Sequence, residues 1–394
     1  MTTTPAALSL SELAPRALQS EIRAMTMECD RLGGVNLAQG VCDTEPPAAV
    51  LDGAKHAIDA GHNIYTRLDG IARLRAGIST KIQHFQGVST DPDREILVAS
   101  GATGAFHAAV MALLNPGDEV ILFEPFYGYH LSTLSSLRIQ AVPVPLHAPT
   151  TPTADWSLDY DALQRAITPR TRAILINTPS NPAGKIFTHA EIEAVGHLAI
   201  RHNLFLFTDE IYEHFLYSGA QHISPFSFPN LRERAIVISG FSKTFSITGW
   251  RLGYVTADKK WMAAISYFHD LTFVCAPAPF QHGAAAGLNQ LGPDFYTQLA
   301  ASHQDKRSRI LSALTAAGFD PPVPQGAYYV LAGSSHLPGK TAAEKARHLL
   351  AATGVAAVAG SAFFRPGRGE NLLRFCFAKK DDDLDEACAR LRKL

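Results

Sequence analysis

The sequence predicts an α/β fold, with a mostly parallel sheet sandwiched by helices and a smaller α+β unit beside it. Short segments such as 173–176 and 204–207 are continuously apolar, which suits strands buried on both faces. Such segments alternate with helical patterns through the middle of the chain, as in parallel sheets with crossover helices. From about Gly292 the pattern changes to a long amphipathic helix followed by mixed strands and helices.

The central part contains the expected strands of the parallel sheet. They cover residues 95–100, 119–123, 140–145, 173–177, 204–209, 235–239 and 252–256. We expect crossover helices over 104–114 and 190–201, because Asn115-Pro116-Gly117 and His202-Asn203 are typical helix ends.

The C-terminal part has a different order of elements. We expect helices over 295–317, 341–353 and 381–394, with strands at 328–331 and 372–377. The predicted division is a large cofactor-binding domain over 46–291 and a small domain formed by 1–45 together with 292–394.

Composition favours small-molecule chemistry. The 394 residues carry a formal net charge of −1, which offers no field for nucleic acid or an anionic membrane. Five scattered cysteines without a C-x-x-C pair indicate neither a disulfide framework nor a zinc site, so we expect a reducing cytoplasm. The first 16 residues lack the pattern of a secretion signal, and no apolar run is long enough to span a membrane.

Lys243 is the most informative residue. It follows the predicted strand 235–239 in a run of small polar residues, where burial lowers the pKa of an ammonium group and leaves an amine able to form a Schiff base. Arg251, eight positions later, offers a permanently charged guanidinium group that can bind a phosphate. Hydroxyl groups are added by Ser242, Thr244 and Ser246. A lysine beside a phosphate cradle suggests pyridoxal phosphate. The alternative is an exposed lysine and arginine on a loop.

Three further segments lie at the carboxyl ends of predicted strands, where ligands bind in open parallel sheets. The turn Ser100-Gly101-Ala102-Thr103-Gly104 opens a helix whose amides can hold a phosphate, although such turns also arise for steric reasons. Asp209 ends the strand 204–209 and suits a protonated pyridine nitrogen, or else caps a helix. Asn181 lies in a loop with two prolines that aims its amide into the crevice or simply forms a turn.

Taken together, these segments resemble the class I/II aminotransferases of the fold type I pyridoxal-phosphate superfamily, from about Asn36 to Lys379. Four motifs occur in the family's order: Gly101-Ala102-Thr103, Asn177-Thr178-Pro179-Ser180-Asn181-Pro182-x-Gly184, Asp209-Glu210-Ile211-Tyr212, and Ser242-Lys243-Thr244-Phe245 followed by Gly249-Trp250-Arg251-x-Gly253. The relatives that it resembles include aspartate, kynurenine and methionine aminotransferases.

The resemblance implies a role for each matched residue. Around the cofactor ring, it implies Lys243 as the Schiff-base lysine, Asp209 as the partner of the ring nitrogen, Asn181 and Tyr212 as partners of the phenolic oxygen, and Tyr127 as the stacked aromatic. The implied phosphate ligands are Ala102, Thr103, Ser242 and Arg251, together with Tyr65 from the neighbouring subunit of a homodimer. The implied substrate-binding residues are Gly40, Asn181 and Arg374. An arginine such as Arg374 matches a carboxylate bidentately, although a lone arginine on a strand is often a structural ion pair.

Two positions depart from the family pattern. Gly240 stands where relatives often carry serine, so either Ser239 or Ser242 binds the phosphate. Cys42 stands where many relatives have proline, which alters the expected pocket for the substrate side chain.

The implied reaction is a ping-pong transfer of an amino group from an L-amino acid to a 2-oxo acid. A C–S β-lyase acting on cysteine conjugates is the alternative, because the same lysine supports β-elimination. A pyridoxal-phosphate-binding regulator is disfavoured for want of a DNA-binding region, and a metal hydrolase for want of an H-E-x-x-H motif.

The amino donor stays open. No clear second arginine for a side-chain carboxylate is seen near 277–281. Phe126, Tyr129, Phe273 and Phe363 are the expected apolar walls of the pocket, and the segment near 277–281 loosely resembles the kynurenine and glutamine transaminase branch.

Overall fold

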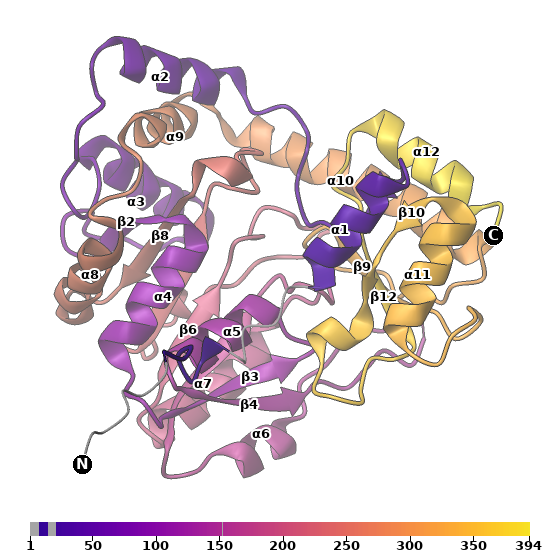
Figure 1. Ribbon diagram of the computed structural model, residues 1–394. Coiled ribbons are helices and arrows are strands. Elements are labelled where there is room, and N and C mark those ends of the chain that lie inside the picture. Colours follow the sequence, from indigo (N-terminus) through magenta and orange to yellow (C-terminus); the bar gives the residue numbers. More distant parts are fainter. Residues whose placement is uncertain (1–7, 15–20, 152) are drawn as a thin grey trace, which may run out of the picture.

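The computed structural model describes residues 8–14, 21–151 and 153–394, and a seven-stranded sheet forms its centre (Figure 1). The strand order is β2-β8-β7-β6-β5-β3-β4. The strands are β2 (Ile96–Ser100), β3 (Glu119–Glu124), β4 (Gln140–Pro145), β5 (Thr171–Asn177), β6 (Phe205–Asp209), β7 (Ala235–Gly240) and β8 (Leu252–Ala257). Strand β8 is antiparallel to both of its neighbours, and the other neighbouring pairs are parallel. Each predicted strand agrees with the structure within two residues at either end.

Both faces of this sheet are apolar because successive side chains alternate between them. On β2, Leu97 and Ala99 enter one buried layer, while Ile96 and Val98 enter the opposite one. The helices around the sheet are α2 (Ala48–Asp59), α3 (Ala72–Gln86), α4 (Gly101–Leu113), α5 (Gly128–Ser136), α6 (Tyr160–Ala166), α7 (His189–Arg201), α8 (Lys259–Phe273) and α9 (Ala278–Gln290). Helices α4 and α8 supply the first layer, and α3, α9 and α7 supply the second. The predicted α/β class is confirmed.

The helix start predicted at residue 104 is wrong by three residues. Helix α4 begins at Gly101, directly after β2, so the turn at 101–103 is the first turn of the helix itself. The last helix, α12 (Asp381–Leu391), also ends three residues before the predicted end, with Arg392 as its C-cap. Three acidic residues in its first turn favour the start that is observed.

The remaining elements form an α+β unit from both ends of the chain. Its long helices are α1 (Glu21–Arg31), α10 (Pro293–Ala316), α11 (Ala342–Thr353) and α12. Strand β1 (Val35–Asn36) pairs in parallel with β10 (Val355–Ala356), and β11 (Val358–Ala359), β12 (Leu372–Cys376) and β9 (Tyr329–Gly333) form an antiparallel sheet. In Figure 1 the indigo helix α1 lies beside these orange and yellow elements. Residues 1–7 and 15–20 of the predicted small domain lie outside the described residues.

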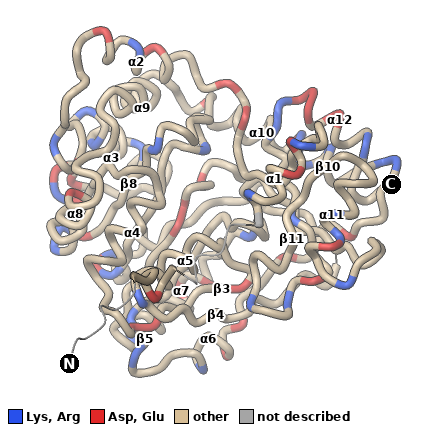
Figure 2. The backbone as a smooth tube through the Cα atoms, in the orientation of Figure 1, with Lys and Arg blue, Asp and Glu red and all other residues tan. Residues whose placement is uncertain are grey.

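The charged residues of both signs are interspersed along the chain. In the view of Figure 2, Lys and Arg positions alternate with Asp and Glu positions over the helices of both parts. Among the described residues, none of the helices is both long and apolar enough to cross a membrane.

Candidate active site

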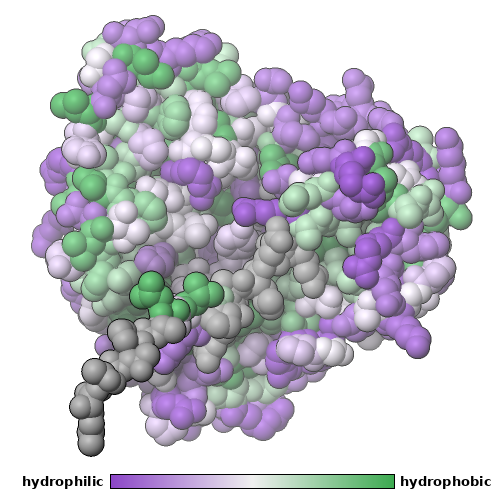
Figure 3. Space-filling model, viewed as in Figure 1, coloured by the Kyte–Doolittle hydropathy of each residue, from purple (hydrophilic) through white to green (hydrophobic). Residues whose placement is uncertain are grey.

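A cavity of ≈ 480 Å³ opens where the carboxyl ends of the parallel strands face the α+β unit. The hollow lies near the centre of Figure 3, between the two parts of the molecule. Of the predicted site residues, the cavity is lined by Gly40, Ala102, Thr103, Tyr127, Asn181, Asp209, Tyr212, Ser242, Lys243, Arg251 and Arg374. Tyr65, which is expected to act in the neighbouring subunit, does not line it.

The topology explains why residues so far apart in the sequence meet here. Asp209 is the last residue of β6, Asn181 follows β5, and Lys243 follows β7 by three positions. These three strands are adjacent and parallel, so their carboxyl ends share one edge of the sheet. The opposite wall comes from β12, which carries Arg374, and from the segment that holds Gly40.

The amine of Lys243 lies at the floor of the cavity. Its Nζ donates a hydrogen bond to the carbonyl oxygen of Gly40 at 3.0 Å. Burial lowers the pKa of this lysine to about 8, and the nearby charges of Arg251 and Arg374 act in the same direction. A substantial fraction of the amine is therefore neutral, and nucleophilic, at mildly alkaline pH.

Arg251 and the start of α4 form a cradle. Arg251 has φ +55°, and its Nη1 donates to the carbonyl oxygen of Thr248 at 2.9 Å. Gly101 has φ +74°, and a Cβ at this position would lie 2.5 Å from Arg251 Nη2, so only glycine leaves room for the guanidinium. The first amides of α4 and the Thr103 side chain lie at the same cavity.

The two candidate serines differ in their surroundings. Ser242 lines the cavity. Ser239 is buried, and its hydroxyl donates to Glu213 Oε1 at 2.6 Å on the far side of the strand end. The geometry therefore favours Ser242 over Ser239 as the hydroxyl that faces a ligand.

Asp209 has a partner that the sequence did not reveal. Its Oδ2 lies 3.0 Å from His130 Nε2, and its Oδ1 accepts the backbone N–H of Ile211 at 3.2 Å. His130 stands in the first turn of α5, three residues after Tyr127, and the two rings meet edge to face at 5.3 Å. His130 lies outside the four motifs, so no sequence signal pointed to it.

Aromatic hydroxyls form a second polar group in the cavity. The hydroxyl oxygens of Tyr212 and Tyr329 lie 2.9 Å apart. Burial raises the pKa of Tyr212 well above its usual value, so this phenol is a neutral hydrogen-bonding group. Tyr127 stacks on Tyr129 with ring centroids 5.3 Å apart.

Arg374 is 1% exposed and lies on the wall opposite Lys243. Its Nη1 donates to Asn181 Oδ1 at 3.0 Å, its Nη2 donates to the carbonyl oxygen of Ala38, and Phe363 lies 4.9 Å from the guanidinium. Its buried Nε has no hydrogen-bond partner among the described residues. An unsatisfied buried donor is costly, which suits an arginine that receives an anionic ligand.

Two of the four side chains that were expected to form apolar walls of the cavity do not line it, so this part of the prediction is wrong. Phe126 is buried in the apolar layer beneath the sheet, and Phe273 packs under Gly104 beside a different cavity. Tyr129 does line the cavity, and Phe363 contributes through its contact with Arg374.

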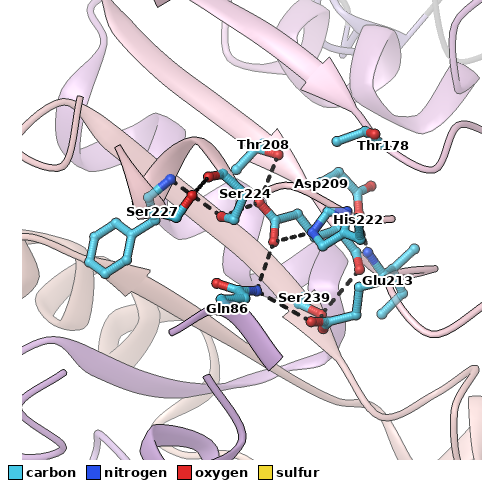
Figure 4. Close-up of polar contacts among 12 residues, drawn as sticks. Gln86, Thr178, Thr208, Asp209, Glu213, His222, Ser224, Ser227 and Ser239 are labelled. Carbon is cyan, nitrogen blue, oxygen red and sulfur yellow. Dashed lines mark hydrogen bonds and ion pairs between the residues drawn. The ribbon is translucent and has the colours of Figure 1, made fainter. Parts of the chain in front are cut away.

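A buried polar network anchors the turn that carries Asp209 and Tyr212. Glu210 accepts hydrogen bonds from Ser224 at 2.6 Å and pairs with His222 at 2.8 Å. Glu213 pairs with buried Lys81 and accepts from Ser239. Figure 4 shows the contacts around His222, Ser224, Ser239 and Glu213. These buried contacts fix Glu210 and Glu213 on the side of the turn away from the cavity, and the side chains of Asp209 and Tyr212 are therefore directed to the cavity.

The residues present fit pyridoxal phosphate. The cradle around Arg251 and Gly101 offers a guanidinium and helix amides to a phosphate, and Asp209 supplies a carboxylate on the same side of the cavity as the Lys243 amine. The unpartnered Nε of Arg374 marks a place for a substrate anion on the opposite wall.

Fold and site together define a pyridoxal-phosphate-dependent transferase of fold type I. The family model for aminotransferases of class I and II matches residues 33–391, and the chain belongs to this family. Its members use pyridoxal phosphate as cofactor, so the chain is a pyridoxal-phosphate-dependent aminotransferase.

Individual relatives agree with this assignment. The chain is 36% identical to a probable N-succinyldiaminopimelate aminotransferase of Mycobacterium tuberculosis, over 98% of each chain. The structure of the N-succinyldiaminopimelate aminotransferase from the same organism superposes with a TM-score of 0.93, covering 98% of this chain and 100% of the other. The methionine aminotransferase of Escherichia coli is 33% identical over 91% of this chain and 92% of its own. A kynurenine–oxoglutarate transaminase of Dictyostelium discoideum is 32% identical over 92% of this chain and 91% of its own.

Proposed function

We propose that the protein transfers the amino group of an L-amino acid to a 2-oxo acid by a ping-pong mechanism, with Lys243 as Schiff-base lysine and proton shuttle. The observation that carries the proposal is the Lys243 amine, whose pKa is lowered to about 8 at the floor of a cavity that also holds Asp209 and Arg374. The relatives named above share amino transfer and differ in the substrate that their names give.

When bound, pyridoxal phosphate supplies an electron sink that acidifies the proton on the substrate's α-carbon. Each contact to it is a proposal for residues of the cavity. Arg251, Ser242, Thr103 and the amide of Ala102 would bind the phosphate, and Asp209 would keep the ring nitrogen protonated. Asn181 and Tyr212 would hydrogen-bond the phenolic oxygen, and Tyr127 would stack on the ring. His130 orients the Asp209 carboxylate through the 3.0 Å contact.

The substrate side of the cavity binds and orients the amino acid. Arg374 grips the α-carboxylate with the help of Asn181, and the backbone at Gly40 bounds the space beside the Lys243 amine. With the cofactor bound, the neutral Lys243 Nζ would take the proton from the substrate α-carbon and pass it to carbon C4′ of the cofactor, and it would move a proton in the reverse direction in the second half of the cycle.

We propose a homodimer in which Tyr65 reaches the phosphate site of the neighbouring subunit. Tyr65 is 77% exposed and Ile64 82% exposed, so two neighbouring apolar side chains lie at the surface. Both line a second cavity together with Ser100, the residue immediately before Gly101 of the phosphate cradle. A partner subunit seated there would bury these side chains and bring its own Tyr65 toward the cradle.

The domain division and the compartment are also proposals. Residues 46–291 form the cofactor-binding domain, and 1–45 with 292–394 the small domain, because β1 pairs with β10 and the apolar cluster around Cys29 joins both ends of the chain. The cytoplasm suits the five cysteines, all of which are unpaired thiols.

The Lys243→Ala variant tests the proposal. It should lose amino transfer from every donor while its unfolding temperature stays near that of the wild type. Retained turnover in this variant would end the proposal. The C–S β-lyase alternative finds no support in the relatives named above, and assaying pyruvate and ammonia release from cysteine conjugates without a 2-oxo acid decides it directly.

A further inference from the structure

Tyr329 lines the cavity but has no part in the function proposed above. It is the first residue of β9, and only 1% of its surface is exposed. Its hydroxyl oxygen lies 2.9 Å from that of Tyr212, which is proposed to bind the phenolic oxygen of the cofactor. Its ring centroid lies 4.5 Å from the guanidinium carbon of Arg374, which is proposed to bind the substrate. One side chain therefore contacts both the cofactor side and the substrate side of the cavity.

The antiparallel sheet of the α+β unit fixes the contact with Arg374. Strands β9 and β12 are antiparallel, and Arg374 pairs with Leu331. Tyr329 lies two residues before Leu331, so it is the diagonal neighbour of Arg374 on the same face of the sheet. A guanidinium over a tyrosine ring is attracted by the quadrupole of the ring. The ring of Tyr329 is therefore held on this side independently of its hydroxyl.

The hydroxyl end of Tyr329 is confined by Gly40. A Cβ at Gly40 would lie 2.1 Å from the Tyr329 hydroxyl oxygen, so the hydroxyl fits there because residue 40 has no side chain. In the part of the chain that the structure describes, this hydroxyl has one hydrogen-bond partner, the hydroxyl of Tyr212. The neighbouring Tyr328 hydroxyl donates instead to the carbonyl oxygen of Gly40 at 3.3 Å. The geometry thus directs the hydroxyl of Tyr329 to Tyr212.

The number of protons on the two hydroxyls decides which of them donates. Burial raises the pKa of Tyr329 to about 12 and that of Tyr212 well above its usual value, so each hydroxyl keeps its proton at neutral pH. A phenol has one proton to donate. When Tyr212 gives its proton to the phenolic oxygen of the cofactor, the hydrogen bond between the two tyrosines has to use the proton of Tyr329.

We propose that Tyr329 is a positioning residue that donates to the Tyr212 hydroxyl and thereby strengthens the hydrogen bond from Tyr212 to the phenolic oxygen of the cofactor. The inference rests on the proposed function, in which Tyr212 binds that oxygen. Hydrogen bonds in a chain polarise one another, so a hydroxyl that accepts one bond becomes a better donor of the next. The donated bond also fixes the rotation of the Tyr212 hydroxyl.

A spectroscopic titration of the holoenzyme tests this proposal. The visible absorbance of pyridoxal phosphate bound to a lysine changes with pH, because the proton shared by the linking nitrogen and the phenolic oxygen is lost. A donor to the phenolic oxygen stabilises the deprotonated form, so it lowers the pH at the midpoint of the titration. Tyr329→Phe removes the hydroxyl and should raise this midpoint by about 0.2 pH unit or more. Because the ring beside Arg374 remains, KM for amino donors should change less than about threefold.

A double variant shows whether Tyr329 acts through Tyr212. Tyr212→Phe removes the direct donor and should raise the midpoint further than Tyr329→Phe does. Tyr329→Phe added to Tyr212→Phe should then have no additional effect, since its connection to the cofactor is gone. The matched control is Tyr217→Phe, which removes an equally buried tyrosine hydroxyl that donates to the carbonyl oxygen of Ala327 outside the cavity. This control should leave the midpoint unchanged.

Three results would overturn the proposal. One is a smaller rise, or a fall, of the midpoint in Tyr329→Phe. Another is an equal rise in Tyr217→Phe, and the third is the same effect of Tyr329→Phe with and without the Tyr212 hydroxyl, since both would indicate a general structural effect. A wild-type protein that shows no lysine-bound cofactor band would end the proposed function and this inference with it. A normal wild-type titration that Tyr329→Phe leaves unshifted would end this inference alone.

Discussion

Lys243 Nζ donates to the carbonyl oxygen of Gly40, which lies 203 positions earlier in the chain, at 3.0 Å. The close approach depends on the missing side chain of Gly40, because a Cβ there would lie 2.1 Å from the Tyr329 hydroxyl. The N-terminal segment thus covers the lysine, and this burial is the main cause of its lowered pKa.

The pH dependence of cofactor capture follows from that pKa. Only the neutral amine attacks the pyridoxal aldehyde, so the rate at which the apoenzyme binds cofactor covalently should rise with pH and level off above about pH 8, where Lys243 is deprotonated. Stopped-flow absorbance measures this rate. A rise that continues to about pH 10.4, the range of an ordinary lysine, would show that burial does not act on this amine.

Gly101→Ala should weaken cofactor binding by at least about tenfold, since the new Cβ would displace Arg251 Nη2 from the cradle. Backbone strain alone is expected to reduce the free energy of unfolding by about 1–2 kcal/mol. The control is Gly117→Ala, which has φ +92° and open space around the added Cβ. Equilibrium titration with pyridoxal phosphate should show a loss of affinity in the first variant only.

Arg374→Gln should lower kcat/KM for all amino donors about 100-fold or more, chiefly through KM, because the α-carboxylate is common to them. Arg374→Lys keeps the charge but cannot form the bidentate pair, so it should recover only part of the activity. Cofactor absorbance should be unchanged in both variants. A wild-type KM in the glutamine variant would remove Arg374 from the substrate site.

Hybrid dimers test the role of Tyr65. Tyr65→Ala and Lys243→Ala subunits should each be poorly active as homodimers. When they are refolded together, a hybrid contains one site that joins an intact Lys243 to an intact Tyr65 of the other subunit, so activity should return to as much as about one quarter of the wild-type value per dimer. Sedimentation velocity reports the dimer itself. No recovery on mixing would place Tyr65 outside the neighbouring site.

Much of the architecture was predictable because the strands carry apolar residues on both faces and end in polar residues at one edge. Ala173 to Ile176 is buried throughout, and Asn177 and Asp209 mark where the adjacent strands β5 and β6 open into the cavity. The local pattern contains this information. The ends of helices and strands were predicted less accurately. At Gly101, for example, the same residue types suit either a separate turn or the first turn of a helix.

The remaining site residues depend on contacts that no local pattern encodes. His130 meets Asp209 across 79 positions, and Lys243 meets the Gly40 carbonyl across 203 positions. Phe126 and Phe273 were wrongly expected in the cavity because an aromatic residue near a site motif does not reveal which face of its helix or turn it occupies.

The most direct test of the account is to reduce the holoenzyme with borohydride and map the labelled peptide by mass spectrometry. The account predicts one stoichiometric pyridoxyl adduct, on Lys243, that is absent from Lys243→Ala. An adduct on another lysine, or none, would contradict it.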